Sequence, residues 1–154
     1  MLGGIFKMGS LKITIFSLLF IIAFVWIIML FNAGPPKPVV MSEGKEISIV
    51  QGTYCWENFI NNKCVDKIPA SEIIANKKIV PFSVSPQSEI YINFKKAPIE
   101  GIEVDKWLSS DEIEEVKVQY NVFSVPKEKG TYIYSVFGRW AKGSSSYIFA
   151  LEVK

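Results

Sequence analysis

The stretches GTYIYSVFGRW, residues 130–140, and SYIFALEV, residues 146–153, decide the fold class. In both, apolar and polar side chains alternate, which is the period of a β-strand with one face on a core. One face of the second stretch carries Tyr147, Phe149, Leu151 and Val153. The connecting segment AKGSSS is short and rich in turn residues, so the pattern predicts an antiparallel hairpin.

The same alternation recurs toward the N-terminus. It predicts further strands at residues 46–56, 89–95, 101–107 and 115–123. Gly52 interrupts the first of these strands and predicts a bulge or bend. Residues 69–78 and 109–115 are expected to form short helical turns, and Ser109 and Glu112 in the second have the spacing of a capping box. The whole pattern predicts an all-β antiparallel sandwich.

An apolar segment, ITIFSLLFIIAFVWIIMLF, occupies residues 13–31 and contains no charged side chain. A helix of this length spans roughly 28 Å, close to the hydrocarbon thickness of a bilayer. Lys7 and Lys12 precede it without an acidic residue. The positive-inside rule therefore predicts a cytoplasmic N-terminus, residues 1–12, and an extracytoplasmic C-terminal part. We expect the lipid bilayer to be the partner of this segment.

The alternative for the apolar segment is a cleaved secretory signal peptide. Its uncharged run is longer than the roughly 7–15 residues of a signal core. A cut after Ala33 would also put the bulky Phe31 three positions before the cleavage site. Both observations favour an uncleaved single-pass anchor in the cell membrane.

Beyond the anchor, the composition changes twice. Residues 32–45, NAGPPKPVVMSEGK, contain three prolines within four positions and predict a semi-rigid extended stalk. Residues 46–154 are expected to form one extracytoplasmic domain. The chain has 17 basic and 15 acidic residues, and Lys7 and Lys12 account for the excess. The outer domain is therefore neutral, which argues against a nucleic-acid partner.

Cys55 and Cys64 are the only cysteines, and the chain has no histidine. A structural zinc site needs four ligands, so neither a metal nor another cofactor is expected. The eight residues between the cysteines differ from the two of a redox Cys-x-x-Cys motif. Outside the cytoplasm a disulfide persists, and this ring would stabilise the fold by about 2–3 kcal/mol. A reduced, idle pair is the alternative.

Two groups of residues are candidates for partner binding. The cysteine ring could present Trp56, Glu57 and Phe59, whereas the alternative is that Trp56 packs over the disulfide. Arg139, the only arginine, precedes Trp140 before a turn, and both residue types are enriched in binding hot spots. The alternative for this pair is a surface ion pair and a core side chain.

The C-terminal segment KGTYIYSVFGRWAKGSSSYIFALEVK, residues 129–154, resembles the last two strands of bacterial immunoglobulin-like domains. It is also similar to the end of small uncharacterised cell-envelope proteins and lipoproteins of Bacillus-type bacteria, some of which carry a G-x-Y-C-W segment like residues 52–56. The resemblance covers residues 46–56 and 129–154. It implies an Ig-like sandwich and an envelope location, and it implies no activity. A fainter likeness is to sandwich domains of bacillar proteinase inhibitors.

Catalytic signatures are missing from the sequence. The lack of histidine excludes Ser–His and Cys–His nucleophile pairs, and there is no Gly-rich phosphate loop. The acidic residues from Asp105 to Glu115 lack calcium-loop spacing and are interpreted as a solvated face. We therefore expect a non-catalytic domain that binds a protein or an envelope component. The alternatives are a peptidase-inhibitor-like surface domain and an accessory subunit of a membrane complex.

Overall fold

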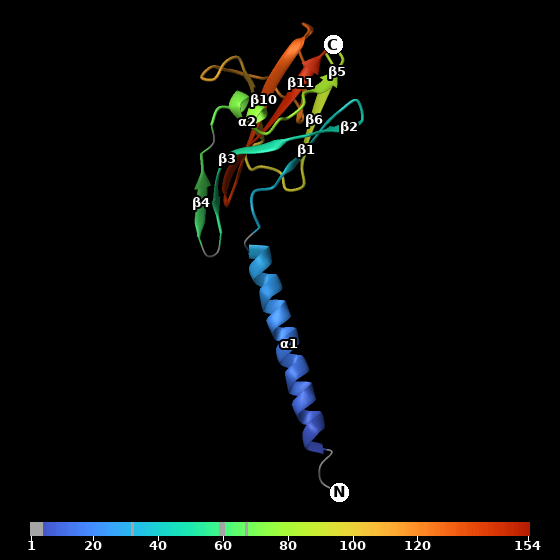
Figure 1. The fold of residues 1–154 in the computed structure, drawn as a ribbon, viewed down its shortest axis with the longest axis vertical. Helices are drawn as coiled ribbons and strands as arrows, with labels where there is room; N and C mark the ends of the chain where they lie inside the picture. The colour runs from blue at the N-terminus through green and yellow to red at the C-terminus, as the bar shows by residue number, and fades with distance from the viewer. Residues whose placement is uncertain (1–4, 32, 59–60, 67) are drawn as a thin grey trace. The chain divides into compact units, whose positions relative to one another are not determined.

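The computed structural model describes residues 5–31, 33–58, 61–66 and 68–154. The chain forms two compact units. The first comprises Met1–Gly34 and Asn58–Asn61 and contains a long helix. The second, which we call the β-domain, comprises Pro35–Glu57 and Asn62–Lys154 and contains all the described strands (Figure 1).

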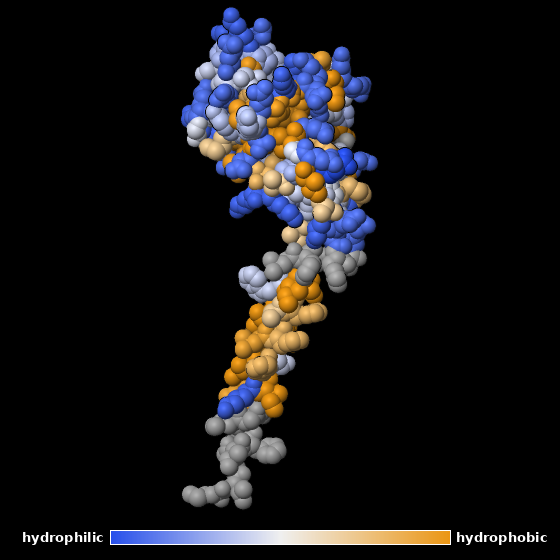
Figure 2. All heavy atoms as spheres, turned by 180° about the vertical axis from the view of Figure 1, so that it is seen from behind, coloured by the Kyte–Doolittle hydropathy of each residue, from blue (hydrophilic) through white to orange (hydrophobic). Residues whose placement is uncertain are grey.

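The long helix α1 (Ile5–Phe31) contains the predicted apolar segment and begins before it. Side chains from Leu11 to Ile27 are exposed, so α1 buries none of this apolar surface against the protein. Figure 2 shows hydrophobic side chains along most of its visible face. The helix is long and apolar enough to cross a membrane, and an N-terminal signal sequence has the same properties.

The β-domain contains eleven described strands and one short helix, with bounds as follows. They are β1 (Pro38–Ser42), β2 (Lys45–Ile47), β3 (Val50–Glu57), β4 (Asn62–Val65), α2 (Ala70–Asn76), β5 (Phe82–Val84), β6 (Glu89–Phe94), β7 (Ile102–Trp107), β8 (Ile113–Glu115), β9 (Val122–Ser124), β10 (Gly130–Trp140) and β11 (Gly143–Val153).

These strands form a four-stranded and a seven-stranded sheet, so the predicted mainly antiparallel β-architecture is confirmed. The smaller sheet has the order β2-β1-β6-β9, and the larger has the order β4-β3-β11-β10-β7-β8. In the larger sheet β5 also pairs with β11, and this pair is the one parallel pair among the described strands.

One hydrophobic core lies between the sheets, because each sheet turns alternate side chains toward the other. The smaller sheet contributes Val40, Ile90, Ile92, Phe94 and Phe123, and the larger contributes Val104, Tyr134, Val136, Tyr147, Phe149 and Leu151. Aromatic rings meet across it: Phe94 and Tyr147 have centroids 5.9 Å apart, and Phe123 and Tyr134 5.0 Å apart. Each fully buried side chain of this size stabilises the fold by about 1.5–3 kcal/mol.

The hairpin predicted from residues 130–153 is confirmed, and it is longer than its sequence pattern. β10 and β11 pair without interruption from Gly130↔Val153 to Trp140↔Gly143. The turn is therefore only Ala141 and Lys142, and the serines after it belong to β11. Gly143 has a φ of +136°, and a Cβ there would collide with the carbonyl oxygen of Cys55. This close approach of β3 to the turn requires glycine.

The irregularity predicted at Gly52 is also present. Ser145 pairs with Tyr54 and Tyr147 pairs with Gln51, so β3 has one residue more than β11 over this interval. The additional residue makes a bulge. A side chain at Gly52 would collide with the Ser146 hydroxyl, so the glycine lets β3 lie close to β11.

The predicted stalk differs most from the structure. The sequence predicts a stalk over residues 32–45. Within that range, Pro38–Ser42 form the strand β1, which pairs with both β2 and β6. Val40 is fully buried. Proline is tolerated here because Pro38 is the first residue of its strand. The β-domain therefore begins earlier in the chain than the alternation pattern indicates.

Two other sequence predictions are wrong. The strand expected over residues 115–123 is divided by a turn at Tyr120 and Asn121, which both have positive φ. Gln119 and Val122 exchange hydrogen bonds of 2.9 Å across this turn. Residues 109–115 form no helical turn. Ser109 does accept a hydrogen bond from the Glu112 amide at 3.1 Å, but the chain then enters β8.

Candidate functional site

The larger sheet has an outer face, turned away from the core, that α2 covers only in part. Ala70 and Ile73 of α2 pack on Ile148, with Trp107 and Ile133 at the margin of this contact. The first residues of α2 are preceded by Pro69, which fixes a backbone geometry suited to a helix start. The remainder of the outer face is left open beside the helix.

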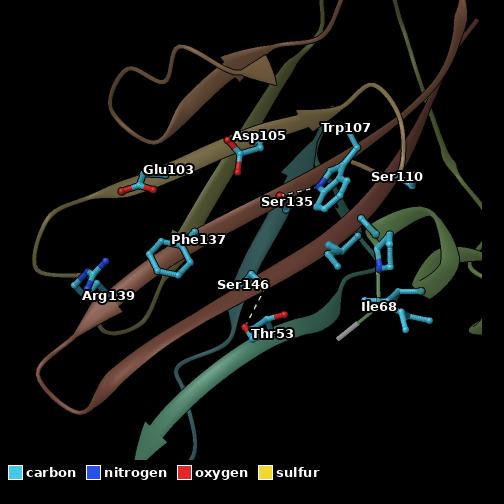
Figure 3. Close-up of a pocket in the computed structure, with 14 residues that line it drawn as sticks. Thr53, Ile68, Glu103, Asp105, Trp107, Ser110, Ser135, Phe137, Arg139 and Ser146 are labelled. Atoms are coloured by element: carbon cyan, nitrogen blue, oxygen red, sulfur yellow. Dashed lines mark hydrogen bonds between the residues drawn. The ribbon is translucent and has the colours of Figure 1, made fainter. Parts of the chain in front are cut away.

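This open part is a hollow of about 560 Å³, which we call the outer groove. Its main lining residues come from adjacent strands of the sheet, namely Glu103, Asp105 and Trp107 of β7, Phe137 and Arg139 of β10, and Ser146 of β11 (Figure 3). Ile68 and α2 form the opposite wall. Strand alternation places every second side chain on this face.

Hydrogen bonds hold several of these side chains in place. The Trp107 indole nitrogen donates to the Ser135 hydroxyl at 3.0 Å, and the Ser146 hydroxyl donates to the Thr53 carbonyl at 3.1 Å (Figure 3). The Arg139 guanidinium lies over the Phe137 ring, 5.7 Å from its centroid. The groove is thus built from ordered polar and aromatic groups on a rigid sheet.

The electrostatic character of the groove is acidic. Asp105 lies opposite Glu115 of β8, and Glu103 is two residues away on the same face of β7. Burial raises the pKa of the Asp105 carboxyl above its ordinary value, and repulsion from Glu103 and then Glu115 raises it further. The ion pair between Lys106 and Glu114, at 2.6 Å, involves the opposite face of β7.

The residues predicted from the cysteine segment meet at a second hollow, of about 310 Å³, on the same sheet. Cys55 and Cys64 form a disulfide between directly opposed positions of β3 and β4, with Cα atoms 4.0 Å apart. The hollow is lined by both cysteines and by Trp56, Glu57, Arg139 and Trp140. Phe59, also predicted to bind a partner, lies outside the described residues.

Burial separates these candidates into two groups. Trp56 and Trp140 are only 4% and 3% exposed, and their rings meet edge to face with centroids 5.9 Å apart. The Trp140 indole nitrogen donates to the Lys96 carbonyl at 2.9 Å. Both tryptophans are therefore core side chains in this structure. For Trp140 this is the alternative from the sequence, whereas Trp56, whose alternative is to pack over the disulfide, packs against Trp140. The exposed aromatic residues among the described part of the β-domain are Tyr91 and Tyr120.

Arg139 and Glu57 are exposed, so they remain available to a partner. The Arg139 Nε lies 3.5 Å from a carboxylate oxygen of Glu100, a surface ion pair of the kind that the sequence left open. Because Arg139 lines both hollows, it connects the outer groove with the disulfide region.

Sequence reasoning missed the acidic and aromatic residues of β7. The alternation in residues 101–107 does place Glu103, Asp105 and Trp107 together on one face. What the pattern does not reveal is that α2 covers only part of that face. No three His, Cys, Asp or Glu side chains among the described residues are grouped to hold a metal ion. The arrangement offers contacts for binding a ligand through aromatic, carboxylate and hydroxyl groups.

Comparison with protein-family models, with curated proteins and with solved structures finds no match for this chain.

Proposed function

We propose that the chain is a single-pass membrane protein whose β-domain lies outside the cytoplasm and binds a protein or an envelope component through the outer groove. The apolar helix α1 supports a membrane anchor with a cytoplasmic N-terminus, because Lys7 and Lys12 lie in its N-terminal part. The Cys55–Cys64 disulfide supports an oxidising, extracytoplasmic location for the β-domain.

We further propose that the β-domain has Ig-like architecture. The pairing of β6 with β9, and the order β7-β10-β11, correspond to the B–E and C–F–G neighbours of that fold. Tyr132 supports the assignment, because its hydroxyl donates to the Glu128 carbonyl at 2.9 Å near the start of β10. A tyrosine corner of this kind marks strand F of Ig domains. The elements from β2 to α2 then form an addition before strand B.

The observation that carries the binding proposal is the part of the outer face that α2 leaves uncovered. A β-sheet in a sandwich needs only one apolar face, and the other face is usually polar and flat. Here the second face is hollowed, bounded by a helix, and lined by a tryptophan, a phenylalanine and two carboxylates. A concave site with a few ordered polar groups on a rigid support is typical of a binding site.

Site-specific photocrosslinking in intact cells tests this function. A photoreactive phenylalanine analogue at Phe137 in the groove is compared with the same analogue at Tyr120, which is 99% exposed in the turn before β9. We expect one distinct adduct from position 137 that position 120 does not give. If position 137 gives no adduct, or only the adducts of position 120, the groove is not the binding surface.

A further inference from the structure

Among the residues that the structure describes, no lysine or arginine forms an ion pair with the carboxylates of the outer groove. Ion pairs within 4 Å in the described chain join Lys106 to Glu114, Arg139 to Glu100 and Lys154 to Glu152, and none includes Glu103, Asp105 or Glu115. Asp105 faces Glu115 across β7 and β8, and Glu103 lies two residues along β7 on the same face, in a domain whose overall charge is balanced. Like charges at directly opposed positions of a sheet destabilise it.

Apolar surface lies immediately beside these charges. Trp107 and Ile113 are cross-strand neighbours on the outer face, and Ile113 is exposed. On the other side Phe137 is opposite Glu103. A ligand in the groove thus meets a row of carboxylates with an aromatic ring at each side, as Figure 3 shows for Glu103, Asp105, Phe137 and Trp107.

We infer that the outer groove receives a lysine- or arginine-bearing peptide segment of a partner protein, with its basic side chains toward Glu103 and Asp105. This inference rests on the proposed function and names the ligand class for it. A basic side chain relieves the repulsion among the carboxylates, and its methylene groups contact Trp107 and Phe137. Among the described lining residues Arg139 is the one basic side chain, and it pairs with Glu100, so Glu103 and Asp105 give the groove a net negative charge that favours a basic ligand.

A neutral glycan is the competing ligand, because sugars also stack on aromatic rings and donate hydroxyl groups to carboxylates. It would leave the carboxylates of Glu103 and of the partly buried Asp105 without a counter-charge. Charge complementarity therefore favours the basic peptide.

A direct binding measurement tests the inference. The full chain is placed in nanodiscs of zwitterionic phosphatidylcholine and titrated with the capped peptide Gly-Lys-Leu-Lys-Gly, followed by fluorescence anisotropy. The same peptide with acetylated lysines and a tetramer of N-acetylglucosamine are the comparison probes. We expect only the lysine peptide to bind, with an affinity that falls as salt is added.

The variant Glu103→Gln with Asp105→Asn should weaken this binding about tenfold, the scale of two partly exposed charge pairs. The matched control is Glu46→Gln with Glu128→Gln, which removes the same charge from exposed positions elsewhere. Thermal unfolding verifies that the groove variant is folded. Equal binding by both variants, by the acetylated peptide, or by the sugar in place of the peptide overturns the inference.

Crosslinking from position 137 distinguishes a failure of the basic-peptide inference from a failure of the proposed binding function. If the charge variant keeps its adduct in cells but the lysine peptide does not bind, the groove is a binding surface and the ligand class is wrong. If the adduct itself is missing, the binding function fails and the inference fails with it.

Discussion

The hydroxyl of Tyr147, in the middle of β11, donates a hydrogen bond to the carbonyl oxygen of Pro36 at 2.7 Å, and the Pro35 carbonyl lies 3.3 Å away. Tyr147 is 1% exposed, so this contact is inside the β-domain. It fixes to the β-domain the proline segment that composition alone predicts to be a semi-rigid extended stalk. The β-domain therefore begins at Pro35, and the proline segment is part of it.

Replacing Tyr147 by Phe should lower the free energy of unfolding of the β-domain by about 1–2 kcal/mol, because it leaves the half-buried carbonyls of Pro35 and Pro36 without this donor. Hydrogen exchange of the nearby amides of Lys37 and Val39 should also increase. Denaturant unfolding of the full chain in detergent measures the first effect, and mass spectrometry measures the second. Tyr120→Phe, at a residue 99% exposed, is the matched control and should change neither quantity. Unchanged stability of the Tyr147 variant would mean that the proline segment is not held by this bond.

Trp140→Ala should destabilise the β-domain by about 3–5 kcal/mol, because it removes a buried ring that contacts Trp56 and Phe94. Trp140→Phe should cost less, since a ring remains and only the bond to the Lys96 carbonyl is lost. Trp26→Ala, in the exposed part of α1, is the control and should leave the unfolding of the β-domain unchanged. If Trp140→Ala instead weakened partner binding at constant stability, the indole would be a contact residue as the sequence first allowed.

The Cys55–Cys64 disulfide closes a ring of ten residues, and the loss of chain entropy in the unfolded state predicts about 2–3 kcal/mol of stabilisation. The double variant Cys55→Ala, Cys64→Ala should lose this amount in denaturant unfolding. Reductant should have the same effect on the wild type and none on the variant. Two reactive thiols in the protein isolated from cells without reductant would contradict the disulfide.

Protease added to intact protoplasts should degrade the β-domain and leave a membrane-embedded fragment that contains α1. This result is expected if Lys7 and Lys12 remain in the cytoplasm. Lysis with detergent provides the control that shows full protease access. Recovery of a secreted β-domain without α1 would show instead that the apolar helix is a cleaved signal sequence.

The sequence predicts best those features that depend on local alternation. The hairpin of β10 and β11 and the bulge at Gly52 follow from residue type and spacing. β1 could not be found in this way because prolines suggest an extended linker, and only pairing with β2 and β6 makes it a strand. Tyr120 has the same phase as Val116 and Val118, so alternation does not reveal the turn that divides this stretch.

The candidate site was harder to predict for a different physical reason. Trp56 and Trp140 lie near turns, where a tryptophan is equally able to pack inward or to meet a partner. Their direction is set by the face of the sheet that each position occupies. The groove itself depends on the place where α2 ends on the outer face, which is a tertiary property. Sequence thus indicates the residues of β7 but not their exposure.

The pH dependence of stability should report the repulsion around Asp105. The folded protein holds the Asp105 proton more tightly than the unfolded chain, because burial and the facing carboxylates Glu103 and Glu115 raise its pKa above the ordinary value of 3.8. From β10 the opposed residue is the uncharged Ser135. As the pH rises from that ordinary value through the raised pKa, this group's contribution to stability falls. At neutral pH the folded state carries an unfavourable carboxylate.

Asp105→Asn should therefore stabilise the β-domain at neutral pH, by less than about 1 kcal/mol because the carboxyl is only half-buried. The gain should disappear below the ordinary aspartate pKa, where the wild-type carboxyl is protonated in both states. Unfolding curves between neutral pH and a pH below the ordinary aspartate pKa measure this gain in stability. The matched control is Asp66→Asn, at an exposed position. A loss of stability at neutral pH would mean that the Asp105 carboxylate has a favourable partner within the fold, and its charge would then not be available to a basic ligand.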